Sequence, residues 1–161
     1  MSHDELYVKM ALISWDAHVK RIDALLAALG DEQWQQEISP GRNRGIYLLG
    51  HLMVVHDDMA ELLGLGEKRH PGLQAVFLTN PDNKSGKDMP PVATLRQYWS
   101  DANARLADHF KSMTTGDWFS QHTRMSADDF VKEPHRNKLS VLLSRTSHMA
   151  YHHGQLVLLR K

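Results

Sequence analysis

The chain has 161 residues, a formal net charge of zero and no cysteine. A neutral chain lacks the basic excess of proteins that bind nucleic acid, and a chain without cysteine forms no disulfide and offers no thiolate ligand. Hydrophobic residues make up 42% and charged residues 24%, as is typical of one globular domain, so we expect a single domain over residues 1–161.

The sequence favours a protein of the cytoplasm. Its N-terminus shows no charged region followed by an apolar run, so no secretory signal is expected. No apolar stretch is long enough to cross a membrane, and we expect no membrane partner. The absence of disulfides also fits a reducing compartment.

Apolar residues recur at alternating spacings of three and four in four segments, and this period predicts amphipathic helices. The predicted helices cover residues 8–29, 43–63, 94–113 and 138–160. Thr94 and Gln97 have the spacing of a capping box at the start of the third helix. Asn137 is the expected N-cap of the fourth helix.

Two long connections separate the predicted helices. Residues 64–93 are rich in turn-forming residues in their second half, and a short helix is expected around residues 73–77. Residues 114–136 form the other long connection. Four helices joined in this way predict an all-α four-helix bundle with long crossover connections, which is not a plain up-down-up-down series.

Three histidines are candidates for one metal site. His148 and His152 lie four residues apart, about one helical turn, so both side chains leave the fourth helix on the same side. On a helical wheel they fall in the same stripe as Val141 and Leu159, which faces the core. His51 lies on the inward face of the second helix. Helices that face each other would bring the three imidazoles together.

Such a cluster has a definite chemistry. Three neutral imidazoles around a divalent ion leave its charge uncancelled, and the ion then acts as a strong Lewis acid that lowers the pKa of a bound water or thiol. Histidine nitrogens suit zinc, nickel, iron or copper, and the spacing does not choose among them. The alternative is that these histidines lie in the core or in an interface and are satisfied by hydrogen bonds alone.

Two polar residues accompany the predicted ligands and are the candidate catalytic residues. Asp58 lies two helical turns from His51 on the same side, where it could act as a base, accept an imidazole N–H or contact substrate. The alternative for Asp58 is a carboxylate at the rim that faces solvent. Gln155 lies three residues after His152 and could hydrogen-bond a ligand imidazole or bound water. The alternative for Gln155 is a polar residue at the edge of the bundle or of a subunit. His56, rotated by about 140° from His51, is a weaker candidate ligand.

The segments LLGHLMVVHDDM and SHMAYHHGQLVLLR resemble the DinB-like superfamily, whose members include proteins similar to bacillithiol S-transferases and to mycothiol-dependent maleylpyruvate isomerases. The resemblance covers the whole chain in helix order. The family pattern is a histidine early in the second helix and HxxxH near the C-terminus, commonly followed by a basic residue, Gly and Gln. Here His153 stands where arginine is more usual, outside the three predicted ligands.

The resemblance implies a four-helix bundle, a homodimer, and His51, His148 and His152 as ligands to zinc or nickel. It also implies a reaction with a low-molecular-weight thiol, because characterised relatives activate such thiols for S-transfer or isomerisation. Since the chain has no cysteine, the thiolate must come from a second molecule. We therefore expect a metal-dependent thiol transferase or isomerase whose partners are a small-molecule thiol and an electrophilic substrate. A metal-dependent hydrolase and a non-catalytic, stress-related metal-binding protein are the alternatives.

Overall fold

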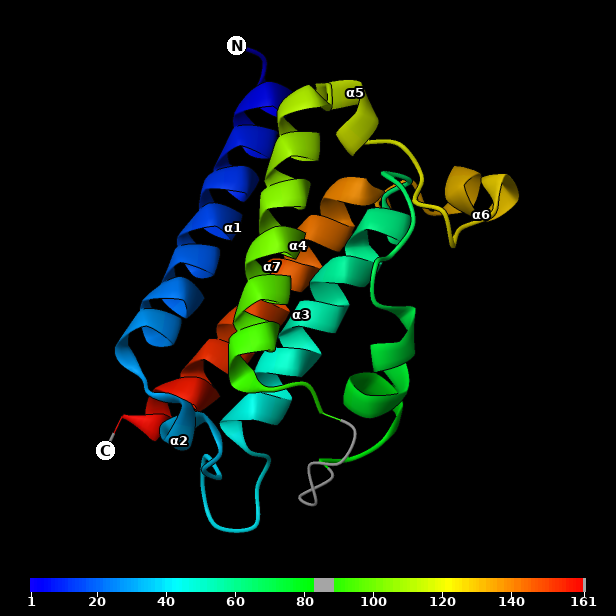
Figure 1. Cartoon of the computed structure of the whole chain (residues 1–161). Helices are drawn as coiled ribbons and strands as arrows, with labels where there is room; N and C mark the ends of the chain where they lie inside the picture. Colours follow the sequence, from blue (N-terminus) through cyan, green and yellow to red (C-terminus); the bar gives the residue numbers. More distant parts are fainter. Residues whose placement is uncertain (83–88, 161) are drawn as a thin grey trace.

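The computed structural model describes residues 1–82 and 89–160, and its regular elements within these residues are all helical. Four long helices form a bundle (Figure 1): α1 (His3–Ala28), α3 (Gly45–Leu62), α4 (Val92–Ser112) and α7 (Lys138–Leu156). Shorter helices lie between and after them: α2 (Asp31–Trp34), η1 (Pro71–Leu73), η2 (Ala75–Thr79), α5 (Thr115–Trp118), α6 (Ala127–Lys132) and η3 (Val157–Leu159). The predicted all-α fold is confirmed, and no described helix is long and apolar enough to cross a lipid bilayer.

The directions of the four helices explain the long connections. α1 packs mainly against α7, and α3 packs mainly against α4. In Figure 1 the members of each pair run in the same direction, and the two pairs run in opposite directions. Two parallel neighbours need a connection that returns along the bundle. The chain between α3 and α4 makes this return, and it carries η1 and η2 past the outside of α3. The bundle is therefore not an up-down-up-down series, as predicted.

Two predicted helix starts are wrong. α1 begins at His3 instead of residue 8, because Ser2 Oγ accepts a hydrogen bond from the Glu5 N–H at 3.1 Å and caps an earlier turn. α4 begins at Val92, and Pro91 is its N-cap residue. The Pro91 carbonyl accepts the first helical hydrogen bond, so the predicted capping box of the third helix does not form.

That capping box, between Thr94 and Gln97, is replaced by other contacts. Gln97 Nε2 donates to Asp101 Oδ1, one turn further along the helix, at 2.8 Å. The predicted cap of the last helix is confirmed, because Asn137 Oδ1 accepts from the Ser140 N–H at 3.0 Å. The α-helical part of this segment ends at Leu156, earlier than the predicted residue 160, and continues as the 3₁₀ helix η3.

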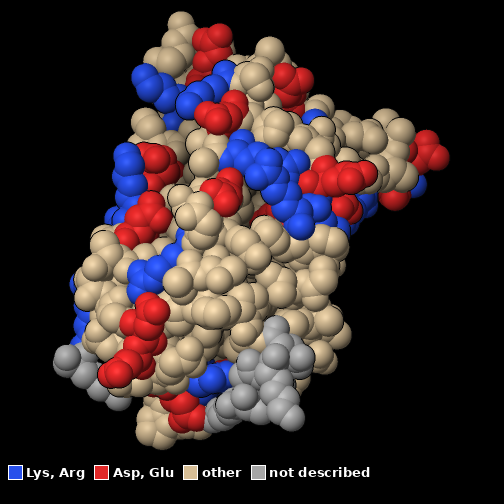
Figure 2. Space-filling model, viewed as in Figure 1, with Lys and Arg blue, Asp and Glu red and all other residues tan. Residues whose placement is uncertain are grey.

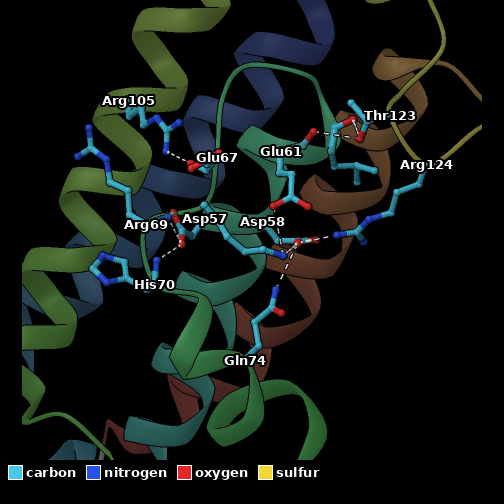
Figure 3. Close-up of polar contacts among 12 residues, drawn as sticks. Asp57, Asp58, Glu61, Glu67, Arg69, His70, Gln74, Arg105, Thr123 and Arg124 are labelled. Atoms are coloured by element: carbon cyan, nitrogen blue, oxygen red, sulfur yellow. Dashed lines mark hydrogen bonds and ion pairs between the residues drawn. The ribbon is translucent and has the colours of Figure 1, made fainter.

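Most of α3 is buried, including three polar residues that follow one another, His56, Asp57 and Asp58. Asp57 fixes the crossover connection to α3: its carboxylate accepts from the backbone N–H of Arg69 at 2.9 Å and of His70 at 2.7 Å (Figure 3). The first part of the connection is thereby held against the helix that carries His51.

Further along the crossover connection, the Phe77 ring is fully buried and packs directly on Gly50 of α3. A Cβ atom at Gly50 would overlap this ring, so glycine is what allows η2 to lie so close to α3. This close approach places the backbone of η2 beside the residue that follows Gly50, which is His51.

Candidate metal centre

Three imidazoles from two facing helices converge on one point. His51 comes from α3, and His148 and His152 come from α7. Nε2 of His148 lies 3.0 Å from Nε2 of His51 and 3.0 Å from Nε2 of His152. One ligand atom from each residue lies within 4.8 Å of the other two. The predicted convergence of the three histidines is confirmed.

Two of the rings are fixed by hydrogen bonds on their far side. Nδ1 of His51 lies 2.9 Å from the Phe77 carbonyl oxygen, and Nδ1 of His152 lies 2.7 Å from Oε1 of Gln155. A carbonyl oxygen only accepts, so Nδ1 carries the proton in both rings. Gln155 is oriented in turn by its amide N–H, which donates to the Tyr151 hydroxyl at 3.3 Å. Both Nε2 atoms therefore point lone pairs at His148.

His148 cannot satisfy both neighbours with protons. A single proton on its Nε2 would serve either His51 or His152, and the other contact would be lone pair against lone pair. A cation at the centre would satisfy all three nitrogen atoms. In a tetrahedral zinc site with bonds of about 2.0–2.1 Å, neighbouring nitrogens are separated by about 3.3 Å, so small movements would accommodate the ion. The residues present fit a divalent metal.

The three imidazoles are held in the form that binds metal. Burial is the largest cause that lowers the pKa of His51 and of His152 below the ordinary histidine value. Burial, together with the neighbouring charges of His152, His51 and Arg145, lowers the pKa of His148 to about 4. All three rings are therefore neutral at pH 7, and no proton has to be displaced when a cation binds.

The donor set is neutral and incomplete. Within residues 1–82 and 89–160, the cluster of possible ligand atoms consists of the three histidines, with no carboxylate among them. Three protein ligands leave at least one coordination position for a molecule from outside, as in catalytic rather than structural zinc sites. An ion held here would also keep its full double positive charge.

Two further histidines lie outside the centre. His56 is fully buried between Trp15 and Trp99, with ring centroids 4.6 and 4.7 Å away, and its Nδ1 donates to Oδ1 of Asn103 at 2.9 Å. Burial lowers the pKa of His56 to about 3. Burial first, and then the charge of Arg21 on α1, lowers the pKa of His153. Neither residue belongs to the converging cluster.

The two candidate catalytic residues have different surroundings. Asp58 is buried, and its Oδ1 accepts from Lys68 at 3.3 Å, Gln74 at 3.3 Å and Arg124 at 2.6 Å (Figure 3). The alternative of a solvent-facing carboxylate is therefore wrong. No hydrogen bond joins Asp58 to the three histidines in the described part of the chain. Gln155 contacts the three-histidine cluster through His152, whose ring it orients, and a catalytic role for either residue stays a prediction.

Sequence reasoning missed two contributors. One is the Phe77 carbonyl, for which no side-chain pattern exists. The other is Arg145, which lies three residues before His148 on α7 and whose charge acts on both His51 and His148. The signal for Arg145 was present, because a residue three positions from a ligand lies on the same helix face.

The comparisons with known proteins give one family match over most of the chain. A family model described as the DinB superfamily matches residues 14–156, from the middle of α1 to the end of α7. The matched range contains all three converging histidines. No curated protein matches the chain.

Proposed function

The chain belongs to the DinB superfamily, and we propose that it is a metal-dependent enzyme that transfers a low-molecular-weight thiol to an electrophilic substrate. The observation that carries the proposal is the convergence of three neutral imidazole nitrogens with no carboxylate among them. The absence of cysteine is the second support, since the nucleophilic sulfur must then arrive on a small molecule.

A divalent ion bound at this centre would supply Lewis acidity that lowers the pKa of a thiol. The residues of the chain would bind the ion and orient its ligands. His51, His148 and His152 would hold the ion without cancelling its charge, and the Phe77 carbonyl and Gln155 keep two of the rings aligned. The thiol releases its proton to solvent, its sulfur bonds to the electrophilic carbon, and the leaving group departs with its electron pair.

The hydrolase alternative uses the same centre but needs a base that activates water. Asp58, the predicted candidate, directs its carboxylate to Lys68, Gln74 and Arg124. Because these contacts hold the carboxylate as an ion-pair partner, Asp58 is not placed to act as that base, which favours the thiol reaction. Three protein ligands would leave a coordination position for a molecule from outside, which argues against a purely storage role.

We also propose zinc or nickel as the metal, and a homodimer as the working assembly. Imidazole ligands suit both metals. A row of exposed apolar side chains on α1 supports the dimer: Leu6, Met10 and Ile13, spaced by four and three, are 41%, 58% and 59% exposed. Light scattering of the wild type and of an Ile13→Asp variant tests this, with dimer expected for the first and monomer for the second.

The reaction is tested on protein loaded with zinc or nickel, with a panel of cellular thiols and small electrophiles. Thioether formation that requires both metal and thiol supports the proposal, and it should be lost in His148→Ala and kept in His153→Ala. Hydrolysis of esters or amides without thiol would instead identify a hydrolase. Inactivity with every thiol at full metal occupancy would defeat the transferase.

A further inference from the structure

Arg145 and Asp58 lie on the same side of the metal centre. Arg145 precedes His148 by three residues, about one turn, and Asp58 follows His51 by two turns. α3 and α7 contact each other and run in opposite directions (Figure 1). Arg145, which precedes His148, and Asp58, which follows His51, therefore lie toward the same end of the bundle. The negative charge of Asp58 also acts on the pKa of Arg145.

The Arg145 guanidinium has no partner in residues 1–82 and 89–160. Its Nε atom is buried without a hydrogen bond, and no described carboxylate forms an ion pair with it. Burial lowers the pKa of Arg145 from its ordinary value, yet a guanidinium stays charged at any physiological pH. A half-buried cation without a partner lowers the stability of the folded chain, so its presence points to a functional role.

Asp58 does not neutralise Arg145. Its Oδ1 already accepts from Lys68 and Arg124, which approach from two distant connections (Figure 3). Lys68 also forms an ion pair with Glu61 at 3.3 Å. This cluster therefore contains three cations, Lys68, Arg124 and Arg145, and two carboxylates, Asp58 and Glu61. One positive charge is not balanced, and it lies next to the three-histidine centre. Figure 2 shows basic and acidic side chains close together in the upper right of the view, above a largely uncharged surface, and further charged side chains along the left edge and at the bottom.

We propose that Arg145 binds an anionic group, a carboxylate or a phosphate, on the thiol substrate whose sulfur reaches the three-histidine centre. The inference rests on the proposed function, since it describes a substrate of the same site. A guanidinium offers paired N–H donors that match two oxygens of a carboxylate or phosphate, which gives orientation as well as affinity. Substrate would then be held at two points, by its sulfur at the histidines and by its anion one helical turn away.

The test uses cobalt-loaded protein, because thiolate ligation to cobalt gives a charge-transfer absorption that reports binding without turnover. Mercaptosuccinate is the anionic probe and 2-mercaptoethanol the neutral one. The wild type is expected to bind mercaptosuccinate about tenfold or more tightly than 2-mercaptoethanol. Arg145→Gln should lose most of this preference while its cobalt content stays unchanged, and Arg145→Lys should keep part of it.

Arg136→Gln is the matched control, because Arg136 is exposed and forms an ion pair with Glu133 at 2.8 Å. It should keep the full preference for mercaptosuccinate. An unchanged preference in folded Arg145→Gln, or no preference in the wild type, would overturn the inference. If Arg145→Gln does not fold, the inference is tested with Arg145→Lys instead. A preference for mercaptosuccinate as strong as that of the wild type would then show that the paired N–H donors of Arg145 do not bind the anion.

A failure of the proposed function would be seen separately, as absence of bound cobalt in the wild type. In that case calorimetry of the metal-free protein with succinate and with inorganic phosphate tests Arg145 alone. Binding of either anion that is lost in Arg145→Gln supports the inference, and the tighter of the two identifies the chemical class. Binding of neither, or equal binding by the variant, overturns it.

Discussion

The carbonyl oxygen of Phe77 lies 2.9 Å from Nδ1 of His51, so the crossover connection fixes the orientation of the candidate ligand that α3 contributes to the three-histidine cluster. This contact leaves Nε2 free to face α7. A ring that is oriented in advance loses less conformational freedom when the ion binds, which raises affinity. The connection is therefore part of the metal centre, although it contributes none of the three ligands.

Gly50→Ala is expected to weaken metal binding without touching a ligand. The added methyl group overlaps the Phe77 ring and pushes η2 away, which costs about 1–3 kcal/mol of stability and disturbs the carbonyl that holds His51. Zinc affinity should fall about tenfold, measured by competition with a chelating dye. Gly154→Ala is the control, because a Cβ there meets nothing within 4 Å; a similar loss in that variant would contradict the explanation.

Removal of single ligands tests the centre directly. His51→Ala, His148→Ala and His152→Ala should each lose most bound metal, because two imidazoles do not hold a divalent ion tightly. His153→Ala should bind normally, since that ring lies outside the cluster. Elemental analysis after dialysis gives the metal content. Metal content that followed His153 would show that a different set of histidines is used.

Gln155→Ala should lower zinc affinity about tenfold, because Nδ1 of His152 loses the acceptor that orients its ring. Gln155→Glu keeps an acceptor oxygen and should largely restore binding. Gln97→Ala is a matched control, since Gln97 is exposed and bonds to Asp101 on the surface of α4. Equal affinities for Gln155→Ala and wild type, from metal titrations at pH 7, would remove Gln155 from the centre.

His56 should make the metal-free protein less stable in mild acid. Its pKa is about 3 in the folded chain and about 6.5 in the unfolded chain, so only the unfolded chain takes up the proton between these values. Its stabilising contribution is complete above pH 6.5 and is lost as the pH falls, by about 2 kcal/mol at pH 5.

Urea unfolding at pH 7 and pH 5 measures this loss. The His56→Gln variant starts less stable but should lose less stability between the two pH values than the wild type does. His135→Gln is the control, because His135 is exposed, and it should follow the wild type. Identical pH dependence for His56→Gln and the wild type would show that another group is responsible.

Local periodicity was enough to predict the four long helices and the convergence of the three histidines. His148 and His152 lie in an apolar stripe, and a stripe that must be buried can only face another helix. The short helices α5 and α6 were missed, because segments of this length have no measurable period. Their caps were visible in the sequence, as Thr114 with Asp117 and Ser126 with Asp129.

The surroundings of the ligands could not be predicted in the same way. Every residue has a backbone carbonyl, and the one at Phe77 is selected only by how the connection packs on α3. Asp58 was correctly placed on the side of His51, but its partners Lys68 and Arg124 come from segments whose positions depend on the complete fold. Tertiary contacts of this kind carry no local signal.

His51 and His148 lie ninety-seven positions apart in the sequence, so an ion bound by both would connect distant parts of the chain. An ion shared by these residues would act as a reversible cross-link between α3 and α7, and the two helices could not separate until it was released. Metal should therefore slow the opening of the folded chain more than it speeds its formation. Loss of the metal should therefore shorten the lifetime of the folded chain.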